Sequence, residues 1–284
     1  MIKWNRNYIL SIQVNGGWID ITMPFTMSFH IIRNPLAQAN TGRFTILNLS
    51  EDTRRKIYKD KYKTAVYKGI ELRAGYGDTK ETLPLIFKGN IKQAYSQRNG
   101  VNYETEIEAY DAGFAYVNAN TGRSFAQGTT DKQIITTLIK DLPHISVGKI
   151  GKFTEKLSKG NTMQGATIEL LKNVTKSNFF IDNEKAYCLQ ENECFKGNLQ
   201  KITSDTGLLG SPLREEALLT FTILFEPRLQ VGQYVQLESS TEKLFNGDYK
   251  VIGVEHQGVI SDAQSGRCIT KVSLYYGAQG LVIL

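Results

Sequence analysis

The side chains best suited to catalysis or metal binding are scattered along this chain of 284 residues. The three histidines, His30, His144 and His256, lie far apart in sequence and share no motif. The Gly-Lys pairs at 148–149 and 151–152 lack the other residues of a phosphate-binding loop, and no His-Glu-x-x-His or Gly-x-Ser-x-Gly pattern occurs. We therefore predict that the protein is not an enzyme, and we assign no catalytic, cofactor-binding or metal-binding residue.

The cysteines and the glutamates fit structural roles. The chain has three cysteines, Cys188, Cys194 and Cys268, so at least one is unpaired. Cys188 and Cys194 are separated by five residues, which is not a zinc-knuckle spacing. We interpret all three as small buried apolar side chains.

Three glutamates resemble an acid–base set at first sight. Glu104, Glu106 and Glu108 alternate with neutral or apolar residues between positions 101 and 109. Alternate side chains of a strand share one face. We therefore predict that the three carboxylates lie on one solvated strand face, which does not suit general acid–base catalysis.

The charge of the chain is unevenly distributed. The formal net charge is +6 and the pI is near 9.0, which suggests an acidic partner or nucleic acid. Much of the excess lies in a basic cluster, which consists of Arg54, Arg55, Lys56, Lys59, Lys61, Lys63 and Lys68. We interpret this cluster as a solvated face. Docking of an acidic protein neighbour is the first alternative and nucleic-acid binding the second, because no recognition-module signature accompanies it.

The first hundred residues read as strands. Residues 8–14 and 25–31 alternate with one apolar face, and Asn15-Gly16 predicts a tight hairpin turn. His30 falls on the polar face of its strand. Further strands are expected at 70–76, 85–95 and 101–109. Gly89 marks a bulge or a point of close approach. Ser50 is a good N-cap for a short basic helix near 51–61.

The middle of the chain changes character. A capping box formed by Thr130 and Gln133 predicts a helix that ends before Pro143. A second helix is expected to begin near Asn161. Two strands at 178–181 and 185–189 then flank a tight polar turn, so the middle third is predicted to be an α+β unit.

The last quarter is again a series of short strands separated by turn residues, which predicts a second small barrel. Residues 87–92 and 245–250 share the pattern Phe-x-Gly-Asn/Asp-apolar-Lys. Chance or shared turn chemistry would also produce such a match. Taken as a true repeat, it predicts two related barrels that flank the insertion. We therefore expect a mainly β fold with a first β-barrel at 1–112, an α+β insertion at 113–203 and a second β-barrel at 204–284.

Several segments resemble a known family when they are taken in order. Residues 206–212, 224–232 and 245–251 with His256 look like the second barrel of bacteriophage tail baseplate hub proteins, and residues 44–50 followed by Thr53-Arg54 resemble their strand-to-helix signature. The N-terminal part of type VI secretion spike proteins is similar. The likeness covers nearly the whole chain.

The resemblance implies a structural hub without catalysis. Such hubs are homotrimers with two barrels of tail-tube type per chain, and they adapt the six-fold tail tube to the three-fold central spike around a channel for DNA. The implied partners are the tail tube protein above, the central spike protein below and other baseplate proteins around it, with a tape-measure protein as a further candidate. DNA is expected only in transit. The implied location is the virion tail baseplate, assembled in the host cytoplasm.

Two other functions are consistent with parts of the sequence. Tyr58, Tyr62 and Tyr67 interleave with the basic cluster, as in a nucleic-acid-binding barrel. A tail-associated cell-wall hydrolase is the other alternative, although we expect no appended lysozyme domain of the kind that some relatives carry. We expect no membrane partner, because no apolar run approaches the ~20 residues needed to span a bilayer. We expect no signal peptide, because residues 1–6 lead into an alternating segment rather than an uninterrupted apolar run with a small-residue cleavage site.

Overall fold

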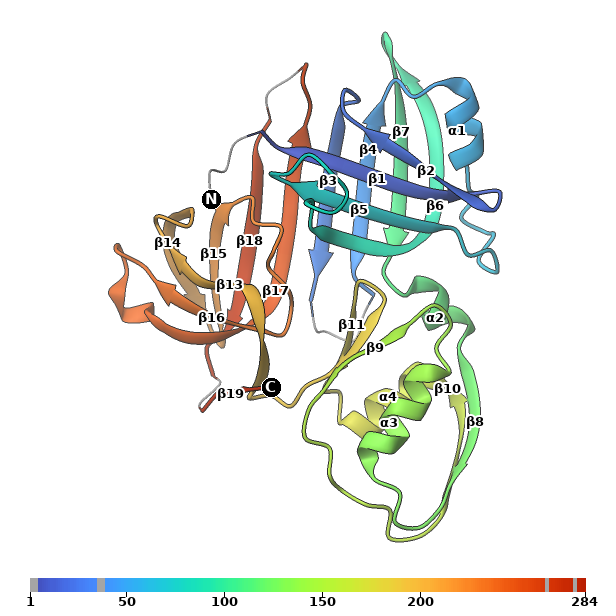
Figure 1. Ribbon diagram of the computed structural model, residues 1–284, viewed down its shortest axis with the longest axis vertical. Coiled ribbons are helices and arrows are strands. Elements are labelled where there is room, and N and C mark those ends of the chain that lie inside the picture. Colours follow the sequence, from blue (N-terminus) through green and yellow to red (C-terminus); the bar gives the residue numbers. More distant parts are fainter. Residues whose placement is uncertain (1–4, 35–38, 264–265, 278–279) are drawn as a thin grey trace.

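Two β-barrels stand side by side in the computed structural model, and a smaller unit of helices and short strands lies beneath them (Figure 1). The structure describes residues 5–34, 39–263, 266–277 and 280–284. The predicted fold class, mainly β with an α+β insertion, is confirmed. The first four residues, on which the signal-peptide prediction depends, lie outside the described ranges. None of the helices described is long and apolar enough to cross a membrane.

The first barrel contains seven strands in the order β3-β4-β7-β6-β5-β1-β2. Their bounds are β1 (Asn7–Val14), β2 (Gly17–Thr22), β3 (Met27–Arg33), β4 (Thr41–Leu47), β5 (Gly69–Gly75), β6 (Leu85–Asn99) and β7 (Asn102–Tyr110). The predicted alternation of apolar and polar residues in β1 places Leu10 and Ile12 on one face of the strand, and both side chains are fully buried in the barrel core. The predicted hairpin turn is confirmed, with positive φ at Asn15 and Gly16.

Gly89 is a point of close approach. A Cβ at this position would lie 2.5 Å from the carbonyl oxygen of Tyr110, so only glycine lets β6 come this near to the end of β7. The bulges lie elsewhere, one of them between Ile91 and Gln93.

The short helix after β4 is α1 (Glu51–Ile57). Its predicted N-cap is confirmed, because the Ser50 side chain accepts a hydrogen bond from the Thr53 amide. The predicted end at 61 is wrong. Lys59 instead forms a β-bridge with Ala94 of β6, which draws the chain out of the helix.

The second barrel has six strands in the order β14-β15-β18-β17-β16-β13. Their bounds are β13 (Glu193–Thr203), β14 (Leu208–Glu215), β15 (Leu218–Leu224), β16 (Gln233–Glu238), β17 (Gly247–Ile260) and β18 (Cys268–Tyr275). A 3₁₀ turn, η1 (Lys243–Phe245), precedes β17, and the short β19 (Val282–Ile283) pairs with β13.

Six strands of the first barrel follow the same order as the six strands of the second, whereas β2 has no counterpart and β1 pairs antiparallel with β5 where β13 pairs parallel with β16. The order β3-β4-β7-β6-β5-β1 corresponds to β14-β15-β18-β17-β16-β13. The pattern shared by residues 87–92 and 245–250 falls at β6 and at the start of β17, but two residues out of structural register, because the bulge after Ile91 corresponds to the bulge after Val251. The match also shows a repeat that sequence reasoning missed. β4 and β15 are both seven residues long and both end in Phe-Thr-Ile-Leu, at 44–47 and 221–224.

One pairing joins the barrels into a continuous sheet. The second half of β17 pairs antiparallel with β3, from Val254 opposite Arg33 to Ile260 opposite Met27. Figure 1 shows the resulting row of strands across both barrels, in the order β14-β15-β18-β17-β3-β4-β7-β6.

The unit beneath the barrels has its own apolar core, which includes Ile134, Ile135, Leu138 and Leu171. Its elements are α2 (Gly113–Asn118), β8 (Asn120–Phe125), α3 (Asp131–Lys140), β9 (Ser146–Ile150), β10 (Asn161–Ala166), α4 (Thr167–Thr175), β11 (Phe179–Asp182) and β12 (Lys185–Cys188). The predicted capping box of α3 is present, and so is the predicted hairpin, whose turn residues Asn183 and Glu184 both have positive φ.

The predicted start of the second helix is wrong. Residues 161–166 form β10, which pairs along its whole length with β8, and α4 begins only at Thr167. The strand pairing overrides the apparent capping pattern at Asn161.

The division at 112 and 203 stays a prediction. The pairing of β13 with β16 favours placing β13 with the second barrel rather than with the insertion.

Candidate functional site

The structure does not bring the three histidines together. His30 lies on the outer face of β3, as predicted, with its Nε2 2.7 Å from Glu255 Oε1 on β17. His144 stacks on Tyr67, with ring centroids 3.8 Å apart. His256 is fully buried between the barrels.

The other chemically suggestive residues also have structural surroundings. Cys188, Cys194 and Cys268 are free and buried, so the interpretation as buried apolar side chains is confirmed. Glu104 and Glu106 share a face of β7 and accept hydrogen bonds from neighbouring side chains of β6. Within the described ranges, no group of three or more His, Cys, Asp or Glu side chains could hold a metal ion.

The basic cluster is not a single solvated face, so that interpretation is wrong in part. The Lys59 ammonium is buried and donates to the carbonyl oxygens of Val66 and Ile91. Burial, with the nearby charge of Lys68, lowers the pKa of Lys59 to about 8. Lys68 donates to the carbonyl oxygens of residues 56, 57 and 58 and thereby caps the C-terminus of α1.

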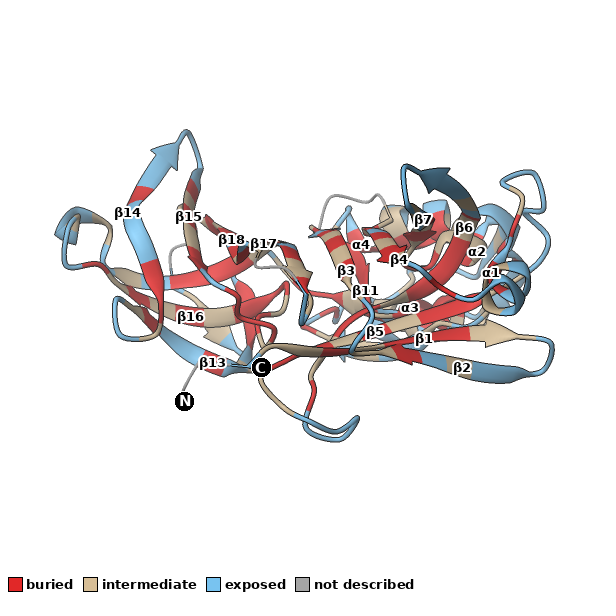
Figure 2. Ribbon diagram, turned by 90° about the horizontal axis from the view of Figure 1, so that it is seen from above, coloured by how far each residue is buried: buried red, intermediate tan, exposed pale blue. Residues whose placement is uncertain are grey.

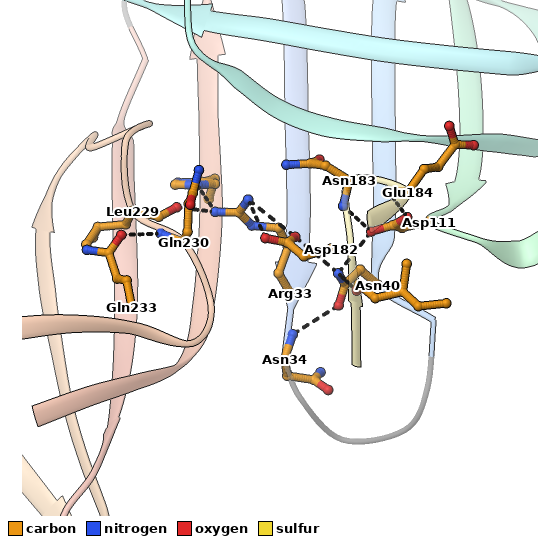
Figure 3. A network of polar contacts seen from close by, with 12 residues as sticks. Arg33, Asn34, Asn40, Asp111, Asp182, Asn183, Glu184, Leu229, Gln230 and Gln233 are labelled. Carbon is orange, nitrogen blue, oxygen red and sulfur yellow. Dashed lines mark hydrogen bonds and ion pairs between the residues drawn. The ribbon is translucent and has the colours of Figure 1, made fainter. Parts of the chain in front are cut away.

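The best-defined polar site is the junction where the two barrels and the insertion meet (Figure 3). Its centre is Arg33, at the end of β3, which is only 2% exposed although arginine is rarely buried. Its Nη1 lies 3.4 Å from Asp182 Oδ2, at the end of β11. Its Nη2 donates to the carbonyl oxygen of Leu229 and lies 3.4 Å from His256 Nε2. The guanidinium of Arg33, which belongs to the first barrel, therefore contacts both the insertion and the second barrel.

His256 is held in one tautomer by this arrangement. Arg33 can only donate, so His256 Nε2 accepts and the ring proton is assigned to Nδ1, which lies 2.9 Å from Thr270 Oγ1. Burial, and secondarily the positive charge of Arg33, lowers the pKa of His256 well below its usual value of 6.5. The imidazole thus acts as a neutral link between β17, β18 and β3.

A second buried carboxylate ties the insertion to the first barrel. Asp111, which follows β7, accepts hydrogen bonds from the amides of Asn183 (2.6 Å) and Glu184 (2.8 Å) in the turn after β11. Asn40 donates to Asp111 Oδ2 and to the carbonyl oxygen of Ile181. Burial, with the nearby charge of Asp182, raises the pKa of Asp111 to about 8, although the amide donors favour the charged form.

These groups are bound to one another rather than poised for a reaction. The charged end of Arg33 meets Asp182, and the Asp111 carboxylate is occupied by three donors from two elements. A buried network of this kind specifies one arrangement of its parts. We therefore regard the junction as the feature that sets the two barrels edge to edge. No sequence pattern singled out Arg33, Asp111 or Asp182; the only signal was the turn at 182–184.

The outer face of the continuous sheet carries polar side chains across both barrels, interspersed with apolar ones such as Ile32 and Leu224, which are 37% and 41% exposed. Directly opposed residues form a row from Glu108 through Arg43, His30 and Gln257 to Ile269. We give the name polar sheet face to the polar side chains of this surface, which are Ser28, His30, Arg43, Thr45, Glu104, Glu106, Glu108, Thr220, Thr222, Glu255, Gln257, Lys271 and Ser273. It carries both signs of charge rather than the basic excess of the whole chain.

Solved structures with this fold come from phage tails and type VI secretion systems. The tail protein from Neisseria meningitidis MC58 has a TM-score of 0.58 at 12% identity, covering 96% of this chain and 97% of that one. The 43 kDa tail protein of prophage MuSo2 from Shewanella oneidensis has a TM-score of 0.60 at 10% identity, with 94% and 98% covered. The E. coli c3393 protein, a component of the type VI secretion system, has a TM-score of 0.58 at 8% identity, with 93% and 76% covered.

The fold is therefore that of the tail and spike proteins of phages and type VI secretion systems. The family described as "Baseplate hub gp41" matches residues 10–263, and the chain belongs to this family of phage baseplate hub proteins. Among curated proteins, none matches the sequence. The resemblance deduced from the sequence motifs is confirmed.

Proposed function

We propose that this baseplate protein forms a homotrimeric ring at the centre of the tail. The observation that carries the proposal is the pair of barrels with matching strand order, already joined edge to edge in one sheet. Three copies of such a chain supply six similar barrels. A ring of this kind meets a six-fold tail tube on one side and a three-fold central spike on the other.

The polar sheet face would line the channel of the ring. It extends over both barrels, and its opposed residues from Glu108 to Gln257 present both signs of charge. A lining without a large basic excess lets DNA pass without tight binding, because phosphate contacts from lysine and arginine dominate affinity for DNA. DNA is then a transient occupant.

The proposed partners follow from this position. They are the tail tube protein above, the central spike protein below and other baseplate proteins around the ring, with a tape-measure protein as a further candidate. Support comes from the type VI relatives, one of which was solved as a complex of PdpA with VgrG. The location is the virion tail, after assembly in the host cytoplasm.

The proposed role is structural, without catalysis. The titratable groups of the junction hold its parts together. Two members of the basic cluster, Lys59 and Lys68, donate hydrogen bonds to backbone carbonyl oxygens, and those of Lys68 cap the C-terminus of α1. Among the residues that the structure describes, no contact favours the nucleic-acid-binding or hydrolase alternatives.

The test is the assembly state of the purified chain. Light scattering should give a mass about three times the 31.9 kDa of one chain, and negative-stain images should show rings with six similar lobes. A permanent trimer should bury more than about 2,000 Å² per interface. A monomer at micromolar concentration, without rings, would contradict the proposal.

A further inference from the structure

Corresponding edges of the two barrels differ in what covers them. In the first barrel the outer edge of β3 is covered by β17, whereas its counterpart β14 has β15 as its only neighbour in the described part of the chain. The far half of β17 is covered by β3. The far half of its counterpart β6, beyond Ala94, has only β7 beside it among the described strands.

The free side of β6 presents backbone groups in a defined pattern. The amide and carbonyl of Ala94 bond Lys59, so they point away from β7. Backbone groups alternate along a strand, and those of Ser96 and Arg98 therefore point the same way. The side chains from Tyr95 to Asn99 are exposed or half-buried.

The free strand β14 presents apolar side chains as well as backbone. Leu209 is 38% exposed and Leu213 is 59% exposed, which is unusual for leucines in a barrel strand. An uncovered strand edge with exposed leucines is an aggregation hazard unless something pairs with it.

The two free edges lie on opposite sides of the molecule. β14 stands at one end of the row of strands in Figure 1 and the β6–β7 tip at the other, and Figure 2 shows the same separation from above, with β14 mostly exposed. A copy therefore cannot pair its own two edges. Two copies can pair them head to tail, which is the kind of contact that builds rings.

We propose that β14 of one copy pairs antiparallel with the far half of β6 of the next copy and repeats, between chains, the β17–β3 seam found within the chain. The inference rests on the proposed ring. It identifies the partner as a second copy, because β14 and β6 correspond to the two strands that already pair with each other inside the chain.

The internal seam also sets the register. The β17 bulge between Val251 and Gly253 corresponds to the β6 bulge between Ile91 and Gln93, so Val259 corresponds to Asn99. The partner strands β3 and β14 are aligned through the threonines of the two Phe-Thr-Ile-Leu segments, Thr45 and Thr222. Ser28 of β3 lies opposite Thr45, and Leu209 of β14 lies opposite Thr222, so Ser28 corresponds to Leu209.

Since Val259 lies opposite Ser28 in the internal seam, Asn99 should lie opposite Leu209 of the next copy. By the same reasoning Gln97 should lie opposite Leu213. The bulge of β14 between Leu209 and Leu213 interrupts the pairing between these two points.

Disulfide trapping tests this register. Asn99 and Leu209 would form a non-hydrogen-bonded pair, with Cα atoms about 4.5 Å apart, within the range that a disulfide spans. The chain carrying Asn99→Cys and Leu209→Cys should give a covalent trimer on a non-reducing gel, which reductant converts to monomer. The matched control, Asn99→Cys with Leu213→Cys, shifts one partner by two register positions, about 7 Å along the strand, and should cross-link poorly. The three natural cysteines are buried, so the unmodified chain supplies the background.

The outcomes separate the seam from the ring. A trimer by light scattering that cross-links in neither variant, or equally in both, would overturn the seam and leave the ring. A monomer would overturn both. Cross-linked species larger than a trimer would support the strand pairing and overturn three-fold closure.

A second variant blocks the edge without touching the barrel. Ser96→Pro removes an amide that points away from β7, a position where an edge strand tolerates proline. It should leave the unfolding transition of the monomer in place and abolish the trimer. Ser96→Ala loses the contact of the Ser96 hydroxyl with Thr105 but keeps the amide, and it should remain trimeric. A trimeric Ser96→Pro protein would overturn the seam.

Discussion

The two barrels share their strand order and their Phe-Thr-Ile-Leu core strand, yet corresponding edge strands differ in whether another strand covers them. The seam between β3 and β17 contains a buried charged and polar set, with Arg33 and His256 on the inner side and the His30–Glu255 pair on the outer side. The uncovered edge of β14 carries exposed leucines, and that of β6 carries Tyr95 and a run of exposed or half-buried polar side chains. Equivalent barrels therefore differ mainly in where they meet a neighbour, and the internal seam is made permanent by a network that the free edges lack.

The largest expected effect comes from Arg33→Met, which breaks the internal seam. Removing the guanidinium leaves Asp182 buried without its cation, and this should lower the free energy of unfolding by about 3–5 kcal/mol. Urea unfolding followed by far-UV circular dichroism measures it. Arg55→Met is the matched control, because Arg55 is exposed and its ion pair with Glu51 is worth about 0.5 kcal/mol.

A rescue variant sharpens this prediction. Adding Asp182→Asn to Arg33→Met removes the unpaired charge and should restore part of the lost stability. Equal stabilities of Arg33→Met and Arg55→Met would show that the junction does not hold the barrels together.

The equivalence of the two cores is tested by Phe44→Ala and Phe221→Ala. The two phenylalanines occupy the same place in β4 and β15 and are 1% and 4% exposed, so each truncation should cost about 3–5 kcal/mol through lost burial and a cavity. Thermal and urea unfolding report both. Because the sites belong to separate cores, the double variant should show nearly additive losses. A cost below about 1 kcal/mol at one site only would break the match.

The third prediction concerns pH. The folded-state pKa of His256 is depressed, so the unfolded chain takes up a proton below pH 6.5 that the folded chain does not. Acidification should therefore destabilise the wild-type chain relative to His256→Asn by up to about 1.4 kcal/mol per pH unit, from pH 6.5 down to the folded-state pKa.

The raised pKa of Asp111 acts in the opposite direction, since its folded state holds a proton that the unfolded chain releases between about pH 4 and 8. Asp111 is present in both chains, so its contribution cancels in the difference. Urea unfolding of both chains at pH 7.5 and pH 5 supplies the comparison. A difference that does not change with pH would place His256 outside the seam's electrostatics.

The smallest expected effect is at the outer side of the seam. His30 and Glu255 contact across β3 and β17 but are each more than a third exposed at the side chain, so solvent screens their attraction. A double-mutant cycle with His30→Gln and Glu255→Gln should give a coupling of about 0.2–1 kcal/mol. A coupling above about 2 kcal/mol would mean that the outer side, rather than Arg33, dominates the seam.

Much of the local structure could be predicted from the sequence. The alternation around Leu10 and Ile12, the hairpin turn at Asn15-Gly16, the capping box at Thr130 and the turn at 182–184 all depend on neighbours within a few residues. Local chemistry of this kind is the same whatever lies on the other side of the molecule. The predicted start of the second helix at Asn161 was wrong because residues 161–166 form β10, which pairs with β8 more than 30 residues away in sequence.

The repeat was only partly visible. Residues 87–92 and 245–250 lie in corresponding strands but two residues out of register. The signal that agrees with the structure, Phe-Thr-Ile-Leu at 44–47 and 221–224, becomes meaningful only when the strand orders are compared. A search of the sequence for repeated tetrapeptides could have found it.

The sequence by itself determined which residues form strands, which face of each strand is buried and where the chain turns. The tertiary structure alone decided that β17 lies beside β3 and that Arg33 is buried against Asp182 and His256. It also decided that Lys59 is buried, unlike the exposed lysines near it in the sequence. The physical reason is that a period of two specifies the buried side of a strand but not its neighbour. A buried charge, likewise, is tolerated only where groups from distant parts of the chain converge to pair with it.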